Sequence, residues 1–198
     1  MNLQRTALAA ITASLLATLA GGAYAQSAAS ETQRNVDQQK RIEQGLKDGS
    51  LNTKEAARLE KGEARIDKME ANAMKDGKLT DAEKARIQNA QNKESQAIYR
   101  ERHDAQTGNP NSASSQRMQA DVQRNINQQE RINQGVKSGQ LTNREAGKLE
   151  RGESRIARKE ARAGADGHVG AGEQARIQHA ENRESKRIYR QKHDAQTR

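Results

Sequence analysis

Four short segments of the sequence place acidic residues in a pattern that resembles half of a calcium-binding loop. The clearest is "KDGKLTDAE" (75–83), where Asp-Gly is followed by an aliphatic residue and then by a Glu six places after the Gly. Equivalent segments surround Gly49, Gly139 and Gly167. An EF-hand loop has its invariant Gly at position 6 and a bidentate Glu at position 12. The back half of the calcium template is therefore present four times.

The front half of the template is missing. Position 1, which normally carries a chelating Asp, is occupied by Gln44, Asn72, Gln134 and Arg162 in the four segments. A hard cation requires several converging oxygens, so we expect these segments to bind a metal ion weakly at most. That ion would be calcium, or else silver or copper. The best candidate ligands are Asn72, Asp76 and Glu83. The remaining candidate ligands are Asp48, Glu55, Asp166 and Glu173.

A plain turn between two helices explains the same residues without a metal. A Gly just after a helix adopts the left-handed conformation that ends it. "TDAE" (80–83), "TNRE" (142–145) and "NTKE" (52–55) have the form of a capping box, in which the first residue caps the helix and the Glu reaches back. We favour the turn interpretation, and a metal site in these turns is the alternative.

The remaining charged residues indicate binding and not catalysis. No Ser/His/Asp, Cys/His or paired buried-carboxylate arrangement is recognisable, so we do not expect an enzyme. Acidic residues alternate with Lys and Arg at helical spacing, which is typical of a solvated face. Residues 108–198 carry 18 basic and 11 acidic side chains, against 16 and 15 in residues 26–107. A basic cluster in the second half is a candidate polyanion-binding surface, formed by Arg151, Arg155, Arg158, Lys159 and Arg162. With two tyrosines and no other aromatic residue after position 25, specific nucleic-acid recognition is not expected.

These segments lie within a tandem duplication. Residues 34–107 and 124–197 align without a gap, and 41 of the 74 aligned positions are identical. The apolar periodicity predicts an all-α fold with three helices in each repeat. The predicted helices are residues 31–47, 52–75, 80–104, 115–137, 142–165 and 171–195. We expect two elongated three-helix units, helical hairpins with EF-hand-like turns, joined by a linker at 108–116.

The N-terminus has the form of a signal peptide. One Arg precedes an uncharged apolar run, and "AYA" supplies small residues for cleavage after Ala25. The predicted organisation is a signal peptide at 1–25, a first repeat at 26–107 and a second repeat at 117–198. We expect a periplasmic or secreted protein without a transmembrane segment after processing. The chain has no Cys, Phe or Trp, so the predicted core is thin and lacks disulfides.

The doubled pattern "RNVDQQKRIEQGLKDG" and "RIYRQKHDAQT" resembles a group of small exported proteobacterial tandem-repeat proteins, mostly uncharacterised. Some of these carry a transferred silver- or metal-resistance label, so the resemblance implies metal handling in the cell envelope. From the residues we expect an exported, non-enzymatic binding or stress-protective module. Its partner would be an anionic envelope polymer or another protein. The alternatives are metal binding at the Asp-Gly turns and non-specific polyanion binding.

Overall fold

The protein is all-helical over the part of the chain that can be described. The computed structural model describes residues 15–195, and their side-chain surroundings from residue 28 onwards. Its elements are α1 (Leu15–Asp48), α2 (Thr53–Ala73), the 3₁₀ turn η1 (Met74–Asp76), α3 (Asp81–Arg102), α4 (Ala113–Ser138), α5 (Asn143–Ala163) and α6 (Ala171–Lys192). The prediction of an all-α fold is confirmed. No helix in the described range is long and apolar enough to cross a membrane.

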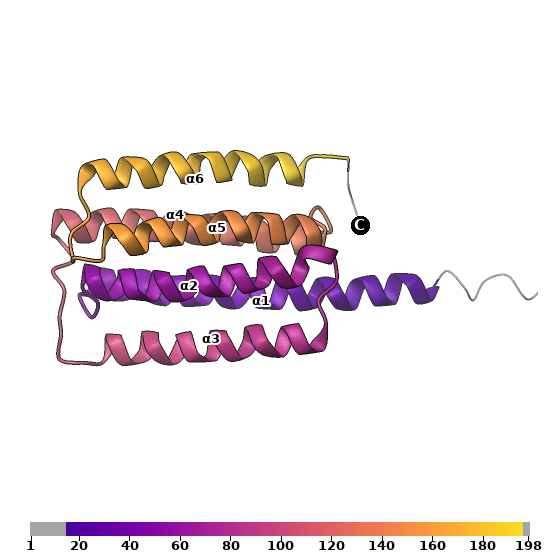
Figure 1. Cartoon of the computed structure of the whole chain (residues 1–198), viewed down its shortest axis with the longest axis horizontal. Helices are drawn as coiled ribbons and strands as arrows, with labels where there is room; N and C mark the ends of the chain where they lie inside the picture. The colour runs from indigo at the N-terminus through magenta and orange to yellow at the C-terminus, as the bar shows by residue number, and fades with distance from the viewer. Residues whose placement is uncertain (1–14, 196–198) are drawn as a thin grey trace, which may run out of the picture.

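The predicted signal peptide lies largely beyond what can be described. Residues 1–14 fall outside the described residues, and α1 begins at Leu15, earlier than the predicted start at residue 31. The first turns of α1 extend past the end of the bundle (Figure 1). Export and cleavage after Ala25 therefore stay predictions.

The turns end and restart the helices as their sequences indicate. Gly49, Gly77, Gly139 and Gly167 all have positive φ, between 77° and 90°, which closes the preceding helix or turn. Capping boxes begin three of the helices: Asn52 with Glu55 at α2, Thr80 with Glu83 at α3, and Thr142 with Glu145 at α5. Each Glu also accepts a hydrogen bond from the backbone N–H of its capping residue.

The two repeats pack against each other in one bundle. Helix α1 lies along α4, and α2 lies along α5, so four central helices come from two repeats. Helices α3 and α6 cover this four-helix centre from opposite sides (Figure 1). The description as two separate three-helix units is not confirmed, because the most extensive helix pairs are formed between repeats.

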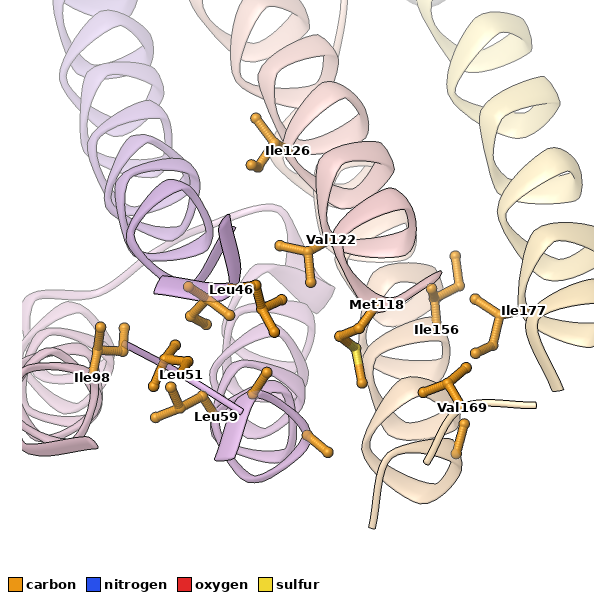
Figure 2. Close-up of a cluster of buried hydrophobic side chains, with 14 of the residues drawn as sticks. Leu46, Leu51, Leu59, Ile98, Met118, Val122, Ile126, Ile156, Val169 and Ile177 are labelled. Carbon is orange, nitrogen blue, oxygen red and sulfur yellow. The ribbon is translucent and has the colours of Figure 1, made fainter. Parts of the chain in front are cut away.

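Two clusters of buried apolar side chains occupy the two ends of the bundle. Figure 2 shows the first, where Leu46, Leu51 and Leu59 of the first repeat meet Met118 and Val122 of the second. The second cluster joins Met74, Leu79 and Ile87 to Ile132, Leu141 and Leu149. Along α2, Leu59 belongs to one cluster and Ala73 to the other. The stretch between these two residues forms the middle of the bundle, and its buried side chains are largely acidic.

The predicted linker holds the two repeats at one end. The Gly108 N–H donates to the Gly49 carbonyl oxygen over 2.8 Å, which fixes the linker on the turn between α1 and α2. The Ser112 side chain then accepts a hydrogen bond from the Ser115 N–H and caps α4. Residues 113–116, assigned to the linker from sequence, form the first turn of α4.

Candidate metal centre in the carboxylate core

One face of α2 and the matching face of α5 are acidic and buried. On α2 the acidic residues recur at intervals of three, four and three, which places them on one side of the helix. The acidic residues of this face, together called the carboxylate core, are Glu60, Glu63, Asp67, Glu70, Glu150, Glu153 and Glu160, each at most 4% exposed. The interpretation of these acidic residues as a solvated face is wrong, because the basic residues between them are on the outside of the bundle and the acidic residues are buried inside it.

Three members of the carboxylate core converge between α2 and α5. Ligand oxygens of Asp67, Glu70 and Glu150 all lie within 4.8 Å of one another. Asn35 of α1 donates to Glu70 Oε2 over 2.8 Å, and Gln129 of α4 donates to Glu150 Oε2 over 2.9 Å. All four central helices therefore contribute to the surroundings of this cluster.

Neutral amides, and no cations, surround the cluster. Among residues 28–195 no lysine or arginine is buried. Glu150 is fully buried, and its Oε1 has no hydrogen-bond partner. Burial raises the pKa of Glu150 to about 7, and burial together with the nearby Glu150 charge raises the pKa of Asp67 and of Glu70 well above their usual values. An unpaired buried carboxylate costs several kcal/mol, so the cluster requires protons or a bound cation near neutral pH.

Further carboxylate pairs flank the core within each repeat. Burial and then the charge of Glu94 on α3 raise the pKa of Glu63, and Glu184 on α6 affects Glu153 in the same way. A Cβ at Gly62 would overlap the Glu94 carboxylate, so this glycine provides the space that the Glu94 side chain fills. Acidic side chains thus extend from the centre of the bundle to both covering helices.

No family model matches this chain. No curated protein and no solved structure matches it either. The resemblance to exported tandem-repeat proteins therefore stays a prediction.

The sequence-predicted ligands of the turns lie at the ends of the bundle and not together in its core. Asp76 Oδ1 accepts from the Lys78 N–H over 2.9 Å, and Asp166 Oδ1 accepts from the His168 N–H over the same distance. Glu83 and Glu173 each accept a backbone N–H at the start of a helix. Asn72 is exposed. Local backbone donors therefore occupy carboxylate oxygens of these four acidic residues.

The remaining two predicted ligands lie at the turn that connects α1 to α2. Asp48 accepts hydrogen bonds from Ser50 and forms an ion pair with Arg102 at 2.9 Å. Glu55 reaches within 4.8 Å of ligand oxygens of Glu101 and Asp104, in a second acidic group near the surface. Glu55 also caps α2. The second group lacks a counterpart in the other repeat, where Gln191 stands in place of Glu101.

The predicted polyanion-binding residues lie on the outer side of α5. Arg151, Arg155 and Arg162 are exposed, whereas Arg158 and Lys159 are half-buried. Arg158 Nε donates to the Ser154 carbonyl oxygen of its own helix over 2.9 Å. A different set of basic residues lines a groove of about 590 Å³ between α4 and α6: Arg131, Arg183, Lys186 and Arg190, with Ser185 and Tyr189.

Sequence reasoning missed the carboxylate core, although a signal for it was present. The spacing from Glu60 through Glu63 and Asp67 to Glu70 equals a heptad seam, the pattern that normally carries apolar residues in a helix bundle. Helix bundles that hold metals in their centre also have carboxylates projecting inward from facing helices. The repeat keeps this seam at Glu150, Glu153 and Glu160.

Proposed function

We propose that this protein is an exported, non-enzymatic module that binds a hard divalent cation in its carboxylate core. The cation site comprises Asp67, Glu70 and Glu150. Asn35 and Gln129 orient two of these carboxylates by donating to one oxygen of each. A bound cation would neutralise charge that no side chain in the core neutralises.

One observation carries this proposal: Glu150 Oε1 is fully buried without a partner, and its carboxylate lies in a cluster with two other carboxylates. Buried polar groups in folded proteins are almost always hydrogen-bonded, and buried charges are paired or coordinate metals. Gln129 occupies the other oxygen, so the free oxygen is the one left for a ligand. A proton would satisfy one oxygen, whereas a cation satisfies three carboxylates together.

The donor atoms select the class of cation. All candidate ligands in the cluster are carboxylate oxygens, and the amide side chains of Asn35 and Gln129 add oxygens nearby. Carboxylate, carbonyl and water ligands suit calcium, magnesium and manganese, whereas silver and copper(I) prefer thiolate and thioether sulfur. The chain has no Cys. We therefore place calcium, magnesium and manganese before the silver or copper suggested by the family resemblance.

The two repeats supply different ligands to the same site. Asp67 and Glu70 belong to the first repeat, and Glu150 belongs to the second. Neither repeat alone therefore contains all three ligands of the site. We propose that the duplication is functional for this reason, because the pair of repeats is the smallest unit that binds the cation.

The test is thermal unfolding of the mature chain at pH 7.5, followed by circular dichroism, with calcium, manganese or silver added after treatment with a chelator. We expect saturable stabilisation by calcium or manganese, of about 3 kcal/mol at a hundredfold excess over Kd. Glu70→Gln should remove most of this stabilisation. Glu83→Gln is the matched control, since it removes a turn carboxylate and leaves the core intact. Loss of the response in Glu83→Gln and not in Glu70→Gln would assign the metal to the turns and overturn the proposal.

A second candidate function is binding of anionic envelope polymers in the groove of the second repeat. Arg131 is held in place by bonds to Ser185 Oγ and to the Ser185 carbonyl oxygen, at 2.7 and 3.2 Å. The equivalent groove in the first repeat is smaller, about 350 Å³, and has Gln96 at the position of Lys186. Lys186 thus adds one basic side chain to a groove that also has an exposed tyrosine, Tyr189. Such a groove favours salt-sensitive contact with a polyanion.

A further inference from the structure

The bundle has an approximate twofold axis that relates one repeat to the other. Ser154 Oγ donates to the Ala64 carbonyl oxygen over 2.7 Å, and these two residues occupy equivalent positions in the two repeats. A residue that contacts its own equivalent lies on the axis that relates the repeats. The axis therefore passes between α2 and α5 near the middle of both helices.

This axis generates a second cluster from the first. At the offset of 90 residues, Glu70 corresponds to Glu160 and Glu150 corresponds to Glu60. By the same symmetry, Glu60 and Glu160 form a pair between α2 and α5, as Glu150 and Glu70 do. The supporting amides are repeated too: Gln39 donates to Glu60 over 3.1 Å, and Asn125 donates to Glu160 over 2.8 Å.

The second cluster also has unsatisfied oxygens. Glu60 and Glu160 are both fully buried, and Oε1 of each has no hydrogen-bond partner. Two acceptor carboxylates that face each other with no donor between them require a proton or a cation. Burial raises the pKa of Glu60 to about 7, which is consistent with the geometry.

One position distinguishes the two clusters. Asp67 of the first cluster corresponds to Ala157, which is buried and offers no ligand. Asp121 of α4 does not converge with Glu60 and Glu160 into a three-carboxylate group, although its charge raises the pKa of both. Asp121 is fully buried, and neither of its side-chain oxygens has a hydrogen-bond partner.

We propose that the Glu60 and Glu160 pair forms a second and weaker site for a hard divalent cation. This inference rests on the proposed function, since it assumes that the first cluster binds the same class of cation. Glu60 and Glu70 are separated by ten residues of helix, about 15 Å of rise, so the two sites share no ligand. The protein would bind two cations per chain, with affinities that differ because one site has Asp67 and the other has Ala157.

The test is isothermal titration calorimetry of the full mature chain at pH 7.5 with calcium and with manganese, each alone. We expect two equivalents of unequal affinity for the wild-type protein. Glu160→Gln should remove the weaker equivalent and leave the stronger one unchanged. Ala157→Asp should restore the missing carboxylate and lower the Kd of the weaker site about tenfold or more. This second variant keeps the test decisive if Glu160→Gln does not fold.

The outcomes separate the two proposals. One equivalent of cation that is lost in Glu70→Gln and unaffected by both Glu160→Gln and Ala157→Asp would overturn the second site alone. No binding of either cation by the wild-type protein would overturn the first site as well. Two equivalents that both disappear in Glu70→Gln would show a single shared centre and would also overturn the second site.

Discussion

Replacing Glu150 by Gln separates the electrostatic cost of the carboxylate core from its packing. Gln has nearly the same shape and retains an acceptor for Gln129, but it cannot ionise. Burial raises the pKa of Glu150 from 4.5 to about 7 in the folded state. One pKa unit corresponds to about 1.4 kcal/mol, so ionised Glu150 destabilises the metal-free fold by about 3 kcal/mol above pH 7.

The sign of the effect follows from proton linkage. Between pH 4.5 and 7 the folded chain holds a proton on Glu150 that the unfolded chain has released, so stability decreases as the pH rises through this window. Below pH 4.5 both states are protonated and the carboxyl group has no such cost. Glu150→Gln should therefore leave the free energy of unfolding nearly unchanged at pH 4 and increase it by about 3 kcal/mol at pH 8.

The assay is urea unfolding in the presence of a chelator at both pH values, followed by circular dichroism at 222 nm. Glu130→Gln is the control, because Glu130 is exposed and forms only a surface ion pair with Lys40. Removing that pair should change stability by less than about 1 kcal/mol at either pH. With calcium or manganese at a hundredfold excess over Kd, the advantage of Glu150→Gln at pH 8 should largely disappear, since only the wild-type protein has the Asp67–Glu70–Glu150 site. Equal destabilisation of Glu150→Gln at pH 4 and pH 8 would refute the reasoning, because it would mean that Glu150 acts only through its hydrogen bond.

Three further changes test other parts of the structure. Ser154→Ala removes the buried hydrogen bond to the Ala64 carbonyl oxygen and should cost about 1 kcal/mol in urea unfolding; an unchanged midpoint would contradict close packing of α2 on α5. The isolated second repeat, residues 112–195, loses half of both apolar clusters and should dimerise or lose helicity in light scattering and circular dichroism; a stable helical monomer would support independent units. Lys186→Gln makes the basic groove resemble that of the first repeat and should lower the salt concentration that elutes the protein from heparin, with no shift expected for Gln96→Ala.

The sequence predicts local structure well because the decisive interactions are local. The capping boxes at Thr80 and Thr142 involve residues three positions apart, and the left-handed glycines follow directly from the end of each helix. These features required no knowledge of the neighbouring helices. For the same reason the helix boundaries of α2, α3, α5 and α6 fall close to their predicted positions.

The carboxylate core could not be assigned in the same way, because its partners are distant in sequence. Glu70 meets Glu150 across 80 positions, and the helix that covers it belongs to the other repeat. The periodicity of α2 locates its apolar stripe. Because the chain has so few large aliphatic residues, the pattern does not show which of the polar residues beside that stripe are buried in the bundle. The acidic heptad spacing was visible, yet only the packing of α2 on α5 decides that this face is buried.

The depth of the Asp67–Glu70–Glu150 cluster has a kinetic consequence. Asp67 is 4% exposed, Glu70 is 1% exposed and Glu150 is not exposed at all, so a cation could enter or leave only when α2 and α5 separate. Its dissociation rate could then not exceed the opening rate of the bundle. Such a protein would exchange its cation slowly and retain it for a time after the surrounding concentration falls.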